Sequence, residues 1–123
     1  MNLLLDTHVL LWWGSQEDLS PDTLSAIADP ENTVYVSAAS IWEISIKQAR
    51  GKLRVDDGIF DTHLDDFEPL PITHADARLA GSLPDHHRDP FDRMLIAQAL
   101  AHDLLLVTRD ARMNLYEVSI LPA

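Results

Sequence analysis

Four acidic residues stand where the chain is expected to turn from one element to the next. Asp6 directly follows one short apolar run, and Asp110 comes three residues after another. Glu43 and Asp92 lie near the starts of two expected helices. Carboxylates that are brought together repel one another and raise each other's pKa unless a cation intervenes. Because Mg²⁺ and Mn²⁺ prefer oxygen ligands and can activate water beside a phosphodiester, the four acids are a candidate metal pocket.

Each acid also has an ordinary structural interpretation. Asp6 could cap the helix that follows it, and Glu43 could pair with Lys47 four residues later on a helix surface. Asp92 could be a capping-box acid near the positive end of its helix, and Asp110 could simply begin a turn. No single acid decides between these interpretations, so the case for a pocket depends on their shared location.

The elements that must position these acids are short apolar strands alternating with helices. The expected strands are 2–5, 33–36, 70–72, 104–107 and, at the edge of the sheet, 118–121. The expected helices are 7–13, 21–29, 37–50, 56–66, 73–81 and 90–102, with loops over 83–88 and 108–116. Ser20-Pro21 and Asp89-Pro90 are typical helix starts, a cap residue followed by proline. This alternation predicts an α/β fold with a mostly parallel sheet, in which sites form beyond the carboxyl ends of strands.

Composition limits the classes of protein to consider. The 123 residues fit a single domain, 1–123, and the absence of cysteine excludes disulfides and thiolate metal sites while permitting a reducing cytosol. We see no signal peptide and no apolar run long enough to span a membrane, so we expect a soluble protein in the cytoplasm. Nine basic and 20 acidic residues give a net charge of −11, which argues against nucleic-acid binding unless cations reverse the local potential. An acidic chain also suits a basic partner.

Four stretches, spread over nearly the whole length of the chain, occur in a recognisable order. They are LLDTHVLLWW (4–13), SAASIWEI (37–44) with Lys47 and GKL (51–53), DPFDRMLIAQA (89–99) and LVTRD (106–110). Taken together, these stretches resemble the PIN-domain ribonucleases, specifically VapC-type toxins of bacterial and archaeal toxin–antitoxin pairs. Each stretch alone is a weak motif, whereas the ordered set is fairly specific.

The resemblance implies a fold, a reaction and partners. The fold is a three-layer α/β/α arrangement around a mostly parallel sheet. The reaction is Mg²⁺- or Mn²⁺-dependent hydrolysis of structured RNA, often tRNA, by a water that the metal activates, leaving a 5′-phosphate. The chain would act as an endoribonuclease toxin, form a homodimer, and be inhibited by a cognate antitoxin that inserts a segment into the active-site groove.

The resemblance also assigns roles to individual residues. Asp6, Glu43 and Asp92 match the family's catalytic metal-binding acids, and Asp110 matches a fourth, more variable one. Hydroxyls near the metal are expected from Thr7 and Thr108, and supporting or RNA-binding contacts from Lys47 and Arg93.

Other polar residues allow more than one interpretation. His86-His87 looks like a metal pair, but neighbours on an extended loop point in opposite directions, and zinc needs more ligands at better spacing. We therefore expect this loop to border the RNA groove. The basic cluster Lys47, Arg50, Lys52 and Arg54 is either a solvated helix end or a set of phosphate contacts.

Two rival functions share the same general features. A phospho-accepting signalling domain also has an acidic Mg²⁺ pocket, but it would need two acids after the first strand and a lysine after a late strand. Here Asp6 stands alone, and no lysine occurs after Lys52. A non-catalytic binding module that kept the fold is the other rival, and the presence of all four acids argues against it.

Overall fold

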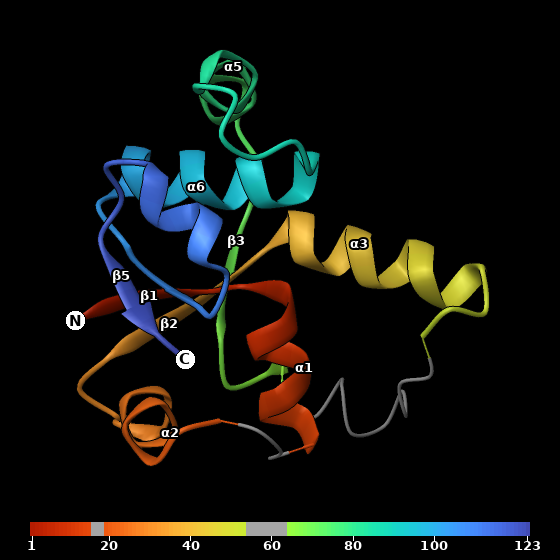
Figure 1. Ribbon diagram of the computed structural model, residues 1–123. Coiled ribbons are helices and arrows are strands. Elements are labelled where there is room, and N and C mark those ends of the chain that lie inside the picture. Colours follow the sequence, from red (N-terminus) through yellow and green to blue (C-terminus); the bar gives the residue numbers. More distant parts are fainter. Residues whose placement is uncertain (16–18, 54–63) are drawn as a thin grey trace.

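A sheet of five parallel strands forms the centre of the computed structural model, which describes residues 1–15, 19–53 and 64–123 (Figure 1). The strand order is β3-β2-β1-β4-β5. The strands are β1 (Asn2–Leu5), β2 (Thr33–Ser37), β3 (Glu68–Leu70), β4 (Leu105–Thr108) and β5 (Ile120–Pro122). The helices are α1 (Thr7–Ser15), α2 (Pro21–Ala28), α3 (Ala38–Ala49), α5 (His74–Ser82) and α6 (Pro90–His102), with a 3₁₀ helix η1 (Ala111–Leu115). The expected α/β fold is confirmed, and every strand pairing in the described residues is parallel.

Strand β1 lies at the middle of this sheet. It pairs with β2 on one side and β4 on the other, with Leu4 opposite both Tyr35 and Leu106. Leu3, Leu4 and Leu5 are fully buried, as expected of a parallel strand that is covered on both faces.

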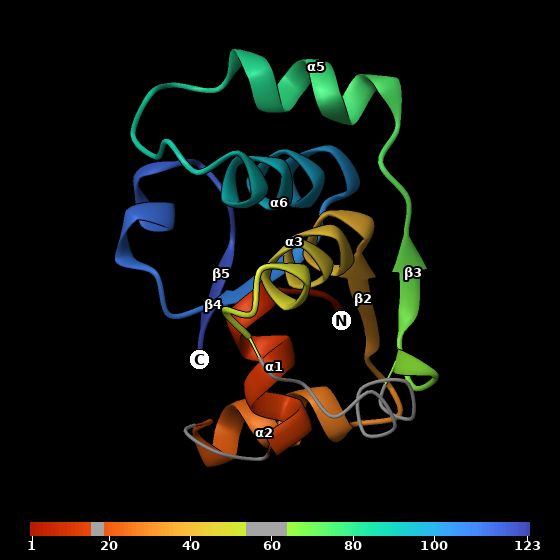
Figure 2. The same cartoon turned by 90° about the vertical axis from the view of Figure 1, so that its right-hand side faces the viewer.

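The two faces of the sheet are covered by different helices. Leu3 and Leu5 face one core with Val9 of α1 and Ile27 of α2. Leu4 faces a second core, formed with α6 and the residues around η1. Helix α5 packs on the outer side of α6 (Figures 1 and 2). The fold is therefore the predicted three-layer α/β/α arrangement.

The predicted helix starts are present as caps. The Ser20 side chain accepts a hydrogen bond from the Thr23 amide, and the Asp89 side chain accepts from the amides of Phe91 and Asp92. Proline occupies the first position of α2 and of α6. The start of α6 is thus fixed locally, and with it the position of Asp92 in the first turn.

A buried polar network ties α5 to α6. Asp76, 1% exposed, closes a capping box with Thr73 at the start of α5 and accepts hydrogen bonds from Gln98 and His102 of α6. Gln98 in turn accepts a hydrogen bond from Ser37 at the end of β2. The network links the outer helix to the strand end where the candidate site begins.

Several expected boundaries were wrong. Strand β3 ends at Leu70, opposite Ser37, because β2 gives way to α3 there and Pro71 has no N–H to offer a ladder. Strand β5 lies slightly later than expected because its register follows β4, with Pro122 opposite Thr108 at an edge where proline is tolerated. The expected loop 108–116 contains η1, and most of the expected helix 56–66 lies outside the described residues.

Across the described ranges, we find no helix that combines the length and the apolar character needed to cross a membrane.

Candidate active site

The candidate site lies where the connections of the sheet change direction. From β1 the chain adds β2 and β3 on one side, and then places β4 and β5 on the other. The carboxyl ends of β1 and β4 therefore flank a topological switch point, where ligands bind in open parallel sheets. Asp6 follows β1, and Thr108 ends β4, so both lie at this point.

Asp6 is held there by β4. Its N–H donates to the carbonyl of Val107 at 3.0 Å, and its Oδ2 accepts a hydrogen bond from the Thr108 hydroxyl at 2.7 Å. The residue is only 4% exposed, and its Oδ1 has no hydrogen-bond partner among the described residues. Burial raises the pKa of Asp6, and the hydrogen bond from Thr108 offsets this only in part. A buried, half-satisfied carboxylate of this kind is unstable without a further positive partner.

Glu43 reaches the same place from α3, which begins directly after β2. Its Oε2 is 2.9 Å from the Nζ atom of Lys47, so the helical pair suggested by the spacing does form. The acid is nevertheless 6% exposed rather than on the surface, and its Oε1 lacks a hydrogen-bond partner among the described residues. The helical pair with Lys47 is therefore present, and the metal-binding role of Glu43 stays a prediction that its second oxygen leaves open.

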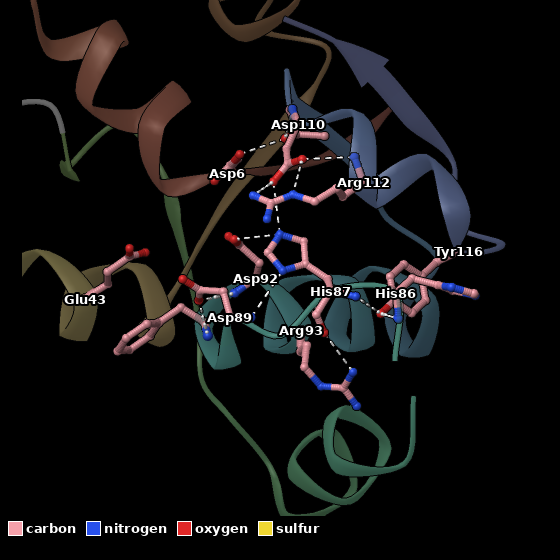
Figure 3. Close-up of polar contacts among 12 residues, drawn as sticks. Asp6, Glu43, His86, His87, Asp89, Asp92, Arg93, Asp110, Arg112 and Tyr116 are labelled. Carbon is pink, nitrogen blue, oxygen red and sulfur yellow. Dashed lines mark hydrogen bonds and ion pairs between the residues drawn. The ribbon is translucent and has the colours of Figure 1, made fainter. Parts of the chain in front are cut away.

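Asp92 and Asp110 meet through a histidine. Nε2 of His87 lies 3.0 Å from Oδ2 of Asp92 and 3.0 Å from Oδ2 of Asp110 (Figure 3). Asp110 also caps η1 through the Arg112 amide, and its carboxylate accepts hydrogen bonds from the Arg112 guanidinium. Asp110 thus begins a turn and belongs to the cluster at once.

The surroundings shift the pKa values of Asp92 and Asp110 in opposite directions. Burial, followed by the charges of Asp6, Asp89, Glu43 and Asp110, raises the pKa of Asp92 to about 8. Burial also acts to raise the pKa of Asp110, but hydrogen bonds from Arg112 and His87 bring it down to about 2. The repulsion among the acids is therefore concentrated on Asp92.

All four acids line one cleft of about 430 Å³. Basic and aromatic side chains share this cleft with them, namely His8, Trp12, Lys47, Arg109 and Arg112. The Arg109 guanidinium lies over the Trp12 ring, 4.4 Å from its centroid. A second hollow of about 200 Å³ adjoins the cleft through Glu43, Lys47 and Asp89 and is also lined by Ile46, Arg50, Lys52 and Phe91. The acids thus lie beside cations that suit a polyanionic ligand.

The donor set fits a divalent cation. Asp6 Oδ1 and Glu43 Oε1 are buried oxygens without hydrogen-bond partners in the described part of the chain, and burial together with the neighbouring acids raises the pKa of Asp92. Hard cations such as Mg²⁺ and Mn²⁺ take oxygen ligands of this type. By distance alone, His87, Asp92 and Asp110 also qualify, since one ligand atom from each lies within 4.8 Å of the others.

Comparison with known proteins identifies the fold family. The PIN domain family matches residues 3–120. The chain belongs to the PIN-domain family. It is 30% identical over 116 residues to Ribonuclease VapC22 of Mycobacterium tuberculosis, covering 91% of this chain and 89% of that protein, which places it with the VapC-type PIN domains.

Solved structures agree on the fold. VapBC2 from Rickettsia felis, crystallised with a DNA fragment from its promoter, has a TM-score of 0.78 at 15% identity and covers 98% of each chain. A toxin–antitoxin complex from Klebsiella pneumoniae has a TM-score of 0.70 at 19% identity, covering 98% of this chain and 96% of that one. At these identities the likeness concerns the PIN fold alone.

The supporting residues that were expected in this PIN domain have different surroundings. Thr108 orients Asp6, and Lys47 lines the cleft. The Thr7 hydroxyl donates to Ser40 at 2.9 Å, which ties the start of α1 to α3, and its expected place near a metal ion stays a prediction. Arg93 donates to main-chain carbonyls of residues 80–87, so its guanidinium clamps the loop before α6, and an RNA contact by Arg93 remains only a prediction.

His87 is the residue whose place in the PIN site the sequence did not reveal. The two histidines do point apart as expected: His86 contacts the Tyr116 ring, while His87 is 2% exposed and faces the acids (Figure 3). The signal was present in that alternation, because one of two neighbours on a loop beside the cleft must face inward. The two histidines do not form a metal-binding pair, because only His87 faces the acids.

Proposed function

We propose that residues 1–123 form one nuclease domain, a metal-dependent endoribonuclease toxin of the VapC type that cleaves structured RNA in the cytoplasm. The observation that carries this proposal is the convergence of four carboxylates on one cleft, two of them with buried oxygens that have no hydrogen-bond partner in the described ranges. The similarity to a protein named as a VapC ribonuclease supports the reaction class.

Asp6, Glu43 and Asp92 would hold the metal ion, with Asp110 beside them, and Mg²⁺ or Mn²⁺ is the proposed ion. When bound, the ion supplies activation of water and stabilisation of the charge that develops on the phosphodiester. Thr108 fixes the orientation of Asp6, and Lys47 fixes that of Glu43. The protein therefore presents oriented oxygens before any ion arrives, which is the preorganisation that such a site needs.

The cations around the acids position the RNA. Lys47, Arg109 and Arg112 line the acidic cleft, and Arg50 and Lys52 line the adjoining hollow. Phosphate contacts of this kind set the register of a nucleic acid without reading its sequence. The overall charge of −11 therefore does not exclude RNA, because the cations are gathered where the phosphates would lie.

A cognate antitoxin is the proposed inhibitor, and a homodimer is the proposed assembly. The fold is shared with a protein solved as a toxin–antitoxin complex, which supports the first. An antitoxin segment in the cleft would cover the same acids and cations that RNA needs. Co-purification with the product of a neighbouring small gene, and sedimentation of the isolated chain, test these two proposals separately.

The central experiment is cleavage of RNA by purified protein with Mg²⁺ or Mn²⁺. We expect Asp6→Asn and Glu43→Gln each to lower the rate by more than about 100-fold, beyond what loss of a supporting hydrogen bond costs. Asp22→Asn and Glu31→Gln are matched controls, since both acids are exposed outside the cleft. Normal cleavage by both folded cleft variants would contradict the proposal, and metal binding without any cleavage by the parent protein would favour a non-catalytic module. Sequencing the 5′ ends after brief expression would identify the RNA.

A further inference from the structure

His87 lies on a segment without regular structure that is nevertheless fixed from both sides. The Arg93 guanidinium of α6 donates to the carbonyls of Ala80, Leu83 and His87 at 2.9, 2.8 and 3.1 Å. The Tyr116 hydroxyl accepts the His87 amide at 2.9 Å and donates to the Pro84 carbonyl at 2.6 Å. These contacts hold the backbone of His87 in one place, so the direction of its ring is part of the fold.

The hydrogen bonds of the ring determine where its proton lies. The Asp89 amide donates to Nδ1 of His87 at 3.2 Å. An atom that accepts a hydrogen bond carries a lone pair, so Nδ1 is unprotonated and the ring proton is on Nε2. This N–H is hydrogen-bonded to Oδ2 of Asp110 at 3.0 Å, and Oδ2 of Asp92 lies at the same distance from Nε2. His87 therefore stands between two acids that would otherwise face each other.

We propose that His87 is a positioning residue of the nuclease site, an Nε2–H donor that orients Asp110 beside Asp92, and that it is not a metal ligand. The proposal rests on the proposed function for its consequence in catalysis. Its geometric part, the tautomer and the absence of ligation, stands apart from RNA cleavage. The proximity of His87 to the two acids is then the mark of a hydrogen bond and not of a three-ligand metal site.

Ligation by His87 would require the opposite tautomer. A metal ion takes the lone pair of Nε2, which moves the proton to Nδ1. The Nδ1–H would then face the Asp89 N–H, and two donors would meet where one hydrogen bond exists now. Asp89 is also the N-cap of α6, so moving its amide away would disturb the helix start that carries Asp92. Mg²⁺ and Mn²⁺ gain little in return, because oxygen is the ligand they prefer.

Nitrogen-15 NMR of the histidine rings tests the tautomer directly. We expect Nε2 of His87 to be protonated and Nδ1 to be bare in the wild-type protein, both in EDTA and with saturating Mg²⁺. Transfer of the proton to Nδ1 when Mg²⁺ is added would overturn the proposal. This measurement needs no RNA, so it decides the matter even if the protein cleaves no RNA and the proposed function fails.

Three variants test the positioning role. His87→Ala removes the donor, and we expect kcat to fall by about 10- to 100-fold while KM changes by less than about threefold. His87→Gln keeps an N–H near the place of Nε2, and we expect it to recover most of the loss. His86→Gln is the matched control, since that ring contacts Tyr116 and is exposed. A folded His87→Gln as slow as His87→Ala, or a His87→Ala as fast as the wild type, would refute positioning.

Discussion

Replacing Asp92 by asparagine should stabilise the metal-free protein. Burial and the neighbouring acids raise the pKa of Asp92 from 3.8 to about 8. The folded chain therefore holds this proton more tightly than the unfolded chain does. The stability that the proton contributes is complete below about pH 4 and is lost progressively as the pH rises toward 8. Asparagine has nearly the same shape and carries no charge, so the free energy of unfolding of the Asn variant does not decrease in this way as the pH rises.

The size of the effect follows from the pH. Each unit of pH between the two pKa values changes the free energy of unfolding by about 1.4 kcal/mol. From about pH 4 to pH 7 this amounts to about 4 kcal/mol, a large part of the roughly 5–15 kcal/mol that stabilises a domain. We therefore expect Asp92→Asn to exceed the wild type by about 4 kcal/mol at pH 7 in EDTA, and to match it near pH 4.

Urea unfolding followed by tryptophan fluorescence measures this difference. The wild type, Asp92→Asn and the exposed control Asp65→Asn are compared in EDTA at several values between pH 4 and pH 7. Mg²⁺ should then stabilise the wild type more than the Asp92 variant and narrow the gap, because an ion that binds only the folded state adds its binding free energy. Equal stability of the two proteins at pH 7, or a gap that does not change with pH, would refute the argument from charge repulsion.

Two further predictions concern the hollow beside the cleft and the buried network. The double variant Arg50→Gln, Lys52→Gln should raise KM for RNA cleavage with little change in kcat. In the inactive Asp6→Asn protein, the same two changes should reduce the slope of log binding constant against log salt concentration by about 0.7 per cation, as measured by fluorescence anisotropy with RNA. An unchanged slope would show that these cations do not contact the RNA. Asp76→Ala should lower the free energy of unfolding at neutral pH by about 2–4 kcal/mol, because it removes the acceptor of hydrogen bonds from Gln98 and His102 and breaks a helix cap. Hydrogen bonds hold the pKa of Asp76 below its ordinary value against the effect of burial, so this loss should shrink as the pH falls below about 4, and urea melts at both pH values check it.

The sequence predicted the meeting of the acids because parallel strands end at one edge of the sheet. Asp6 and Asp110 are about a hundred residues apart, yet each follows a strand, and β1 and β4 are neighbours. Asp92 was placed by purely local chemistry, since Asp89 and Pro90 fix where α6 begins. Strand ends and helix starts follow from rules of backbone geometry that can be applied to a single sequence.

Side-chain directions were harder to predict. Thr7 and Arg93 each adjoin a cleft acid, but on a helix the next side chain points about 100° away, which sends Thr7 to Ser40 and Arg93 to the preceding loop. For His87, the alternation of two neighbouring side chains predicts that one of the pair faces inward but does not say which one. The backbone of His87 is held by Tyr116, far along the chain, so the local pattern alone does not select His87 over His86.

The placement of β1 at the centre of the sheet also governs when this protein can become active during its synthesis. Asp6 is synthesised about a hundred residues before β4, yet its N–H and carboxylate are held by Val107 and Thr108 of that strand. A nascent chain whose β4 has not yet left the ribosome lacks the strand that pairs with β1 on this side, and contacts between residues so far apart in sequence are slow to form. The surroundings of Asp6 are therefore complete only after β4 has been made and has paired with β1.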